Sequence, residues 1–155
     1  MDIRKAKPKD AARLTQIAFA AKAYWGYPAS WIALWRDTLT ITPEYIATVE
    51  VYTAVVGGEI VGFYALIGAG EKLTLNDLWV LPEMIGQGIG RVLFEHACHH
   101  AKTLGAEILE IEADPNTEGF YQHMGAQRVG EHLSEIEGQP RILPVFHLRW
   151  QTSED

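Results

Sequence analysis

The chain has 155 residues, a net charge of −7 and one cysteine, Cys98. This length fits one domain with a sizeable core, and a lone cysteine excludes an internal disulfide and favours a reducing compartment. The acidic balance argues against general nucleic-acid binding, which uses a basic surface. No stretch approaches the roughly 20 apolar residues of a membrane span, and no signal-peptide pattern follows Met1, so no membrane association and a cytoplasmic location are expected.

The first fifty residues carry mainly helical patterns. Residues 3–6 form a short candidate edge strand, and a helix is expected from Pro8, which suits a first helical turn. Its apolar positions recur at helical spacing: Leu14, Ile17, Ala18 and Ala21. A second helix is predicted over residues 30–38, and Thr42 is placed to cap a third.

From residue 49 onward the pattern is typical of strands joined by glycine turns. Gly57-Gly58 indicates a tight hairpin. The predicted strands are residues 51–56, 60–67, 73–81, 107–112, 127–133 and 143–150. An amphipathic helix over residues 88–104 and a short one over 117–124 interrupt them. This order predicts an α+β fold, with a mostly antiparallel central sheet of about seven strands flanked by helices on both faces. We expect one domain over residues 1–150 and a short polar tail over 151–155.

The segment between the strand that ends near Leu81 and the long helix carries the sharpest signal. It reads Ile85-Gly86-Gln87-Gly88-Ile89-Gly90-Arg91. Glycines let the backbone approach a ligand closely, and the first N–H groups of a helix lack internal partners. With the helix dipole, these groups suit a phosphate or pyrophosphate. The segment therefore predicts a phosphate-binding loop.

Two common nucleotide motifs do not fit this loop. The Walker pattern needs Gly-Lys-Ser/Thr, but Gly90 is followed by Arg91-Val92. The dinucleotide fingerprint needs a third glycine one residue later than Gly90, within a βαβ unit that the element order does not provide.

The loop instead resembles the core motif of the GNAT superfamily of acyl-CoA-dependent N-acyltransferases. In that family a strand ending Val-x-Pro leads into Arg/Gln-Gly-x-Gly-x-Gly/Ala at the start of a long helix. Val80 and Pro82 match the strand end, and the glycines match at positions 86, 88 and 90. Ile85 departs from the usual Arg or Gln, which removes one side chain near the pyrophosphate and leaves the backbone groups.

A second match lies downstream of the loop. The family commonly has an Asn, a short helix and then Tyr-x-x-x-Gly, and Asn116, Tyr121 and Gly125 fall in this register. Ala126 replaces the usual Phe after the glycine. The order of elements resembles the GNAT fold along almost the whole chain. The resemblance therefore implies that the expected α+β domain has the GNAT fold.

The resemblance implies transfer of an acetyl group from acetyl-CoA to an amine of a small molecule or protein. Tyr121 would be the general acid that protonates the departing sulfur. The cofactor-binding residues implied are Leu78, Val80, Ile85, Gly86, Gln87, Gly88, Ile89, Gly90, Arg91, Asn116 and Tyr121. A homodimer is a further option, because members of the family often dimerise.

The general base and the acceptor are less defined by the sequence. Asp77 is a candidate base on the same predicted strand as Leu78 and Val80. The alternation of side chains, however, puts it on the face of Trp79 and away from those two residues. Glu71, Glu112, Asp114 and a water chain remain alternatives. Five aromatic residues either pack helices or line the acceptor pocket: Tyr24, Trp25, Tyr27, Trp31 and Trp35. No cluster has metal-site spacing, so no metal is expected.

Two other functions stay open at this point. A non-catalytic acyl-CoA sensor on the same fold fits the absence of an obvious base and the departure at Ile85. A nucleotide-binding domain is disfavoured by the motif failures. The identity of the acceptor, the acyl chain length and the oligomeric state do not follow from the sequence, because one fold serves many functions.

Overall fold

The computed structural model describes residues 1–150, so the predicted tail at 151–155 lies outside the described residues. The chain divides into two compact units. Unit 1 comprises Met1–Ala65 and Asp77–His96, and unit 2 comprises Leu66–Asn76 and the chain from Ala97 onward. The prediction of a single domain over residues 1–150 stays a prediction.

The strands form one seven-stranded mixed sheet with the hydrogen-bonding order β1-β2-β3-β4-β5-β7-β6, as the α+β expectation requires. The strand bounds are β1 Asp2–Lys5, β2 Glu50–Val56, β3 Glu59–Ile67, β4 Lys72–Val80, β5 Ile108–Glu112, β6 Gln127–Ile136 and β7 Gln139–Arg149. β4 and β5 pair in parallel, while β1 with β2, β5 with β7 and β6 with β7 pair antiparallel. The GNAT-type sheet predicted from the sequence is confirmed.

The helices follow the predicted order with shifted bounds. They are η1 Pro8–Asp10, α1 Ala11–Ala23, α2 Ala29–Leu34, α3 Arg36–Leu39, α4 Pro43–Thr48, η2 Pro82–Met84, α5 Ile89–Thr103, η3 Pro115–Thr117 and α6 Glu118–His123. The single helix expected over residues 30–38 is wrong in detail, because Trp35 leaves the helical conformation and divides it into α2 and α3. The Thr42 cap is confirmed, since its side chain accepts the Tyr45 N–H at 3.0 Å.

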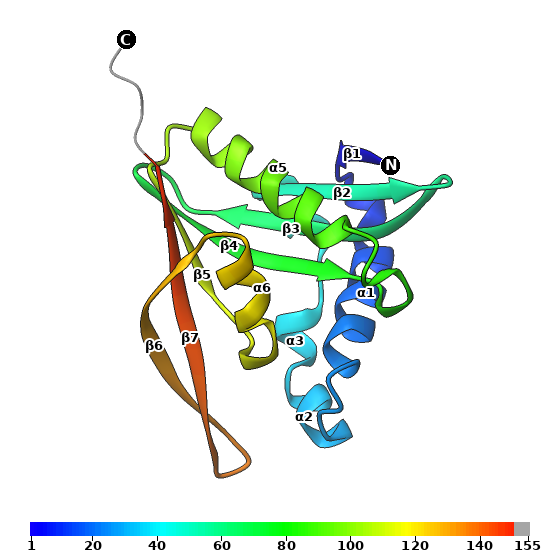
Figure 1. Cartoon of the computed structure of the whole chain (residues 1–155). Coiled ribbons are helices and arrows are strands. Elements are labelled where there is room, and N and C mark those ends of the chain that lie inside the picture. The colour runs from blue at the N-terminus through cyan, green and yellow to red at the C-terminus, as the bar shows by residue number, and fades with distance from the viewer. Residues whose placement is uncertain (151–155) are drawn as a thin grey trace. The chain divides into compact units, whose positions relative to one another are not determined.

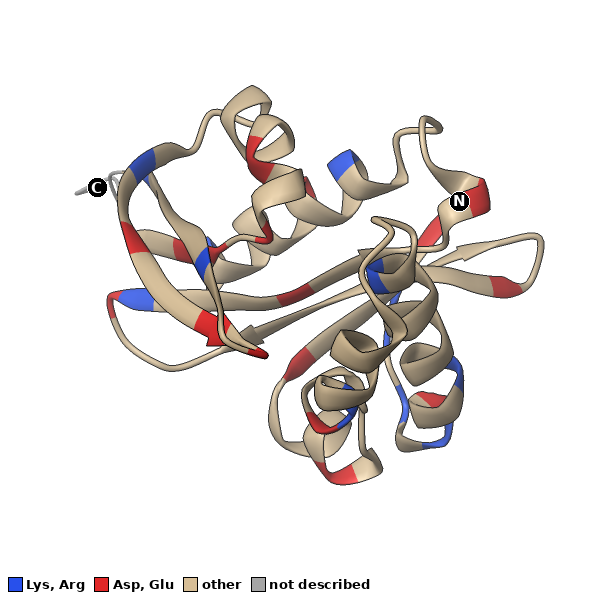
Figure 2. Cartoon of the chain, turned by 90° about the horizontal axis from the view of Figure 1, so that it is seen from below, with Lys and Arg blue, Asp and Glu red and all other residues tan. Residues whose placement is uncertain are grey.

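In unit 1, helices cover both sides of β2 and β3 (Figures 1 and 2). The N-terminal half of α5 lies on one side, where Leu93 is fully buried, and α1 lies on the other, where Leu14 and Ile17 are fully buried. Arg13 of α1 donates to the Ile60 carbonyl of β3 from Nε and Nη2 at 3.0 and 2.8 Å. These contacts tie both helices to the strand beside β4. Among residues 1–150, no helix is long and apolar enough to cross a membrane.

In unit 2, β6 and β7 form a long hairpin that lies beside β5 in hydrogen-bonding order (Figure 1). Phe146 of β7 is fully buried, and its ring centroid lies 6.0 Å from that of Tyr121 on α6. Glu110 of β5 accepts from His147 of β7 at 2.8 Å and from Lys72 of β4 at 3.3 Å. These bonds hold the pKa of Glu110 below its usual value, the His147 bond contributing most.

Gly62 of β3 lies unusually close to the end of β4. A Cβ atom at this position would lie 2.9 Å from the backbone oxygen of Trp79 and 3.1 Å from Cδ1 of Leu93. The first distance is shorter than a real Cβ contact, and the neighbour is backbone rather than a mobile side-chain end. The backbone at Trp79 can therefore keep its position only because residue 62 has no side chain.

Gly62→Ala should lower the free energy of unfolding by about 1–3 kcal/mol, the usual cost of overpacking. Chemical denaturation followed by circular dichroism measures this change. Gly130→Ala in β6 is the matched control, because in the described part of the chain no heavy atom beyond its two neighbours in sequence lies within 4 Å of the new Cβ. Equal stability of both variants would show that β3 does not constrain β4 at this point.

Candidate functional site

The loop between η2 and α5 lies in unit 1 and has the backbone that its glycines predict. Gly86 and Gly88 have φ angles of +87° and +80°, in the left-handed region that costs other residues about 1–2 kcal/mol. Apart from each glycine and its two chain neighbours, no heavy atom of residues 1–150 lies within 4 Å of the position of a Cβ atom there. Residues 85–88 are exposed. The backbone here is accessible to a ligand and is shaped by glycine.

The start of α5 is fixed by packing under this loop. Ile89 is buried, whereas Ile85 is half exposed. The Gly88 carbonyl accepts the Val92 N–H at 3.1 Å, which begins the helical hydrogen bonds. The preceding N–H groups lie in the first turn, so they lack intrahelical acceptors. They are at the positive end of the helix dipole. Arg91 pairs with Glu95 at 2.9 Å on the exposed side of the helix.

β4 leads directly into this loop and carries the candidate base. Leu78 and Val80 are half-buried, and Asp77 is buried. Tyr45 of α4 donates its hydroxyl to Oδ2 of Asp77 at 2.7 Å, and the Trp79 indole N–H donates to Oδ1 at 3.0 Å. The second bond places Asp77 and Trp79 on one face of β4, as the alternation predicted.

Burial raises the pKa of the Asp77 carboxyl above its usual value, and the bonds from Tyr45 and Trp79 partly oppose that rise. A carboxyl with a raised pKa binds a proton more tightly than an exposed one. A base with such a pKa is better matched to proton transfer near neutral pH.

The aromatic residues that were predicted either to pack helices or to line a pocket form two groups in unit 1. Tyr24 and Trp25 make an edge contact with each other at 5.1 Å and are exposed. Tyr27, Trp31 and Trp35 make a second cluster with ring centroids 5.0–6.0 Å apart. The ammonium of Lys22 lies 4.3 Å from the Trp35 ring centroid and 5.1 Å from that of Tyr27. This second cluster therefore accommodates a primary ammonium group by cation–π contact.

Tyr121 lies in unit 2 and is buried on α6. Its ring also contacts Phe120 edge-on at 5.1 Å. Burial, and to a lesser degree the charge of Asp114, raises the pKa of the Tyr121 hydroxyl. The hydroxyl therefore keeps its proton at neutral pH, as a proton donor must. It is also a weaker acid than an exposed tyrosine, so it can give up the proton only as negative charge develops on the group that receives it.

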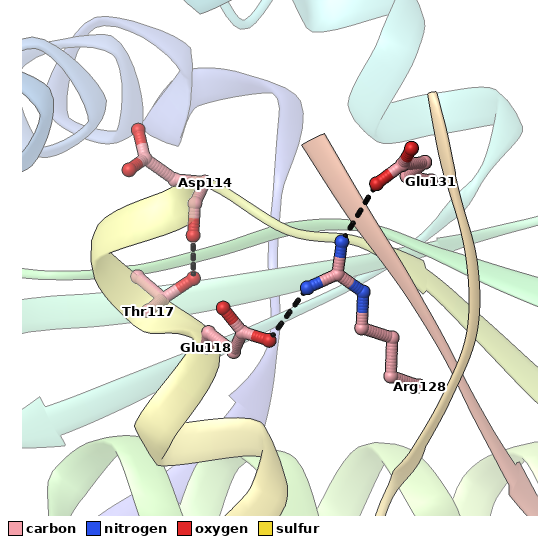
Figure 3. A network of polar contacts seen from close by, with 5 residues as sticks. All are labelled: Asp114, Thr117, Glu118, Arg128 and Glu131. Carbon is pink, nitrogen blue, oxygen red and sulfur yellow. Dashed lines mark hydrogen bonds and ion pairs between the residues drawn. The ribbon is translucent and has the colours of Figure 1, made fainter. Parts of the chain in front are cut away.

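Asp114 organises the turn before α6. Its Oδ1 accepts the backbone N–H and the side-chain amide of Asn116, both at 2.9 Å, and its Oδ2 lies 3.8 Å from Nη2 of Arg141. Its backbone carbonyl accepts the Thr117 hydroxyl at 2.8 Å (Figure 3). One residue, Asp114, thus fixes the turn that carries the predicted cofactor-binding residue Asn116.

A second set of contacts attaches α6 to β6. Arg128 donates to Glu118 at 3.0 Å and to Glu131 at 2.9 Å, so one guanidinium joins the first turn of α6 to the strand (Figure 3). The turn and this ion pair together restrict where Tyr121 can lie.

The structure thus brings Asp77, Leu78, Val80 and the glycine loop together in unit 1, and Asn116 and Tyr121 together in unit 2. Neither Tyr45 nor Lys22 was predicted from the sequence as a site residue. Nothing in the spacing of residues 45 and 77 links them, because their contact is tertiary. The position of Lys22 beside the aromatic run was visible in the sequence, but the ring geometry was not.

The family model for the acetyltransferase (GNAT) domain matches residues 47–125, which include both the glycine loop and Tyr121. The chain belongs to the GNAT acetyltransferase family. The resemblance in the two motifs is therefore confirmed at the level of the family.

Curated relatives agree with this assignment. The chain is 29% identical over 134 residues to the peptidyl-lysine N-acetyltransferase YjaB of Salmonella typhimurium, covering 76% of this chain and 87% of the relative. It is 31% identical over 90 residues to YjaB of Escherichia coli, covering 58% and 56% of the two chains.

Solved structures share the fold. A GCN5-related N-acetyltransferase from Rhodopseudomonas palustris superposes with a TM-score of 0.78 at 22% identity, covering 96% of this chain and 95% of that one. The PaiA N-acetyltransferase of Thermoplasma acidophilum, solved with coenzyme A, gives a TM-score of 0.75 at 21% identity, with 96% and 98% covered.

Gly88→Val should weaken acetyl-CoA binding by about tenfold or more, or ~1.4 kcal/mol. The substitution adds a β-branched side chain at a left-handed position and fills space that the loop leaves open to a ligand. Isothermal titration calorimetry measures the affinity. Gly58→Val is the matched control in the turn between β2 and β3, since Gly58 has a φ of +81° and the same open surroundings.

Both variants should lose similar stability, but only Gly88→Val should lose affinity. Wild-type affinity in Gly88→Val would mean that acetyl-CoA does not contact this loop.

Proposed function

We propose that the protein is an N-acetyltransferase that transfers the acetyl group of acetyl-CoA to a primary amine by direct attack in a ternary complex. The observation that carries the proposal is the exposed loop with left-handed Gly86 and Gly88 at the start of α5. Such a backbone offers several N–H groups and a helix dipole to a pyrophosphate. In the family, backbone groups near Leu78 and Val80 then bind the thioester arm.

Acetyl-CoA as the acyl donor is supported by solved relatives of the same fold. A putative acetyltransferase of Salmonella typhimurium was solved with acetyl-CoA, and the Thermoplasma enzyme with coenzyme A. In this chain, Gly86, Gln87, Gly88, Ile89, Gly90 and Arg91 would hold the phosphates. Asn116 would bind the pantetheine arm.

Tyr121 is proposed to protonate the sulfur as the thioester breaks, and Asp77 to be the base that removes the acceptor's proton. The raised pKa of Tyr121 keeps its proton in place until charge develops. The raised pKa of Asp77 improves it as a base. The two groups therefore have properties that fit opposite roles in one reaction.

The acceptor proposed for testing first is the ε-amino group of a lysine in a protein or peptide. Two relatives carry the name peptidyl-lysine N-acetyltransferase. The cation–π contact of the chain's own Lys22 with Tyr27 and Trp35 supports this choice, because a lysine acceptor carries the same ammonium group. A small-molecule amine remains the other acceptor class, with Tyr24, Trp25 and Trp31 completing the proposed pocket. A homodimer and a cytoplasmic location stay predictions.

Acetyl-CoA should raise the melting temperature, because a ligand that binds only the native state stabilises it by about 2.7 kcal/mol at one hundred times its dissociation constant. Differential scanning fluorimetry with acetyl-CoA, NAD and ATP tests this expectation. A screen of lysine peptides, polyamines and small amines with thiol detection then tests turnover. Stabilisation by acetyl-CoA without thiol release on any amine would favour an acyl-CoA sensor, and no stabilisation would contradict the proposal at its base.

Tyr121→Phe should lower the single-turnover rate by about 10²–10⁴-fold, the usual contribution of general acid–base assistance. Acetyl-CoA affinity should change little, because the ring and most of its packing are kept. Rapid-quench measurements avoid a limit set by product release. Tyr52→Phe, a half-buried tyrosine of β2, is the control and should keep the wild-type rate. Full activity of Tyr121→Phe on the same acceptor would make Tyr121 a packing residue only.

A further inference from the structure

A buried polar cluster in unit 1 joins α4 to β4. Asp77 accepts one hydrogen bond on each carboxylate oxygen, from the Tyr45 hydroxyl at 2.7 Å and from the Trp79 indole at 3.0 Å. Asp77 is only 8% exposed, whereas Tyr45 is half-buried. Of the two, the tyrosine is the more accessible to a group arriving from outside.

The position of this cluster relates it to the proposed reaction. Asp77 is three residues before the end of β4 at Val80, and a strand rises about 3.3 Å per residue. The carboxylate therefore lies roughly 10 Å along the strand from the end of β4, which leads through η2 into the glycine loop. The proposed function places the thioester arm along this same stretch of strand, at Leu78 and Val80. A base needed at the thioester is thus expected on this segment.

Both oxygens of Asp77 are already occupied by donors, and little of the side chain is exposed. The acceptor sites that remain on the carboxylate can be reached directly by an ammonium only where the side chain is exposed, and Asp77 is buried. A tyrosine hydroxyl, by contrast, both donates and accepts, so it can receive a proton on its oxygen while giving its own proton to the carboxylate.

We infer that Tyr45 is a further catalytic residue, which passes the proton of the acceptor's ammonium to Asp77. The inference rests on the proposed acetyl transfer and adds the route by which its base is reached. Tyr45 Oη takes one N–H proton from the ammonium, and the O–H proton of Tyr45 moves to Oδ2 of Asp77. Both hydrogen bonds of the carboxylate survive the transfer.

The remaining protons balance. The neutral amine forms the C–N bond to the acetyl carbon, and the C–S bond breaks. The new amide nitrogen loses a second proton and the sulfur gains one, while Asp77 returns its proton to solvent through Tyr45. One proton is therefore released for each acetyl group transferred.

The energetics fit a relay between these groups. The two proton transfers are concerted, so Tyr45 is neither ionised nor doubly protonated, and their cost is set by the difference between the pKa of the ammonium, ordinarily about 10.4, and the pKa of Asp77. Burial raises the pKa of Asp77, which makes the final acceptor a stronger base than an exposed carboxylate. Tyr45 and Trp79 oppose this rise, so removal of either donor should raise the pKa of Asp77 further.

The test compares Tyr45→Phe and Trp79→Phe, which each remove one donor to Asp77 but differ in the relay. Single-turnover acetyl transfer from acetyl-CoA to a lysine-containing peptide is measured from acidic to alkaline pH. Transfer needs the ionised carboxylate, so in both variants the acidic limb of the profile should move to higher pH. Above that limb, Tyr45→Phe should stay about 10²–10⁴-fold below the wild type, whereas Trp79→Phe should recover most of its rate.

A second measurement does not depend on activity. Carbon-13 NMR of the aspartate carboxyls, assigned with Asp77→Asn, follows the ionisation of Asp77 in the three proteins. An upward shift of the pKa in Tyr45→Phe supports the hydrogen bond, and an unchanged pKa overturns the inference. A shifted pKa combined with wild-type plateau rates in Tyr45→Phe also overturns it, because the contact would then be structural only.

The outcome for the wild type separates this inference from the proposed function. No transfer to any amine contradicts the acetyltransferase proposal itself. Transfer by the wild type that Tyr45→Phe leaves intact contradicts only the relay.

Discussion

The contact between Gly62 of β3 and the backbone oxygen of Trp79 constrains the part of the fold on which the candidate site depends. At that point β4 ends, η2 begins and the chain passes into the glycine loop. Because Leu93 of α5 packs against the same glycine, the helix that begins with the loop is held by the strand beside β4. Close packing leaves no free volume here, since protein interiors are as dense as organic crystals. The loop can therefore have an exposed backbone with left-handed glycines, while the strand before it and the helix after it are held in place by packing.

The two units stabilise their key carboxylates in different ways. Asp77 is held by two neutral aromatic donors and keeps a raised pKa, which suits a group that must bind a proton. Asp114 is held by amide groups and lies near the guanidinium of Arg141, which suits a group that shapes a turn. The same residue type thus suits the proposed proton transfer in one place and shapes a turn in the other, and the difference comes from its partners.

Much of the fold could be predicted from the sequence because it rests on local signals. The glycine turns, the Thr42 cap and the alternation along β4 each depend on residues close together in the chain. The prediction of one helix over residues 30–38 was wrong in detail. The apolar residues keep helical spacing across Trp35, although the backbone leaves the helical conformation there. The contact of Tyr45 with Asp77 spans 32 positions and leaves no trace in composition or period. The candidate loop was therefore predictable, whereas the surroundings of the candidate base needed tertiary structure.

The β6–β7 hairpin has a consequence for how molecules of this protein behave beside one another. β6 is the last strand in the sheet order and is ten residues long, and most of its side chains are exposed, including Val129 and Leu133. A long edge strand with apolar side chains is a template for intermolecular strand pairing. Arg128, Glu131 and Glu135 interrupt the apolar positions with charge. These side chains act as gatekeepers, so Arg128 and Glu131, which also attach α6 to β6, contribute to colloidal stability in concentrated solution.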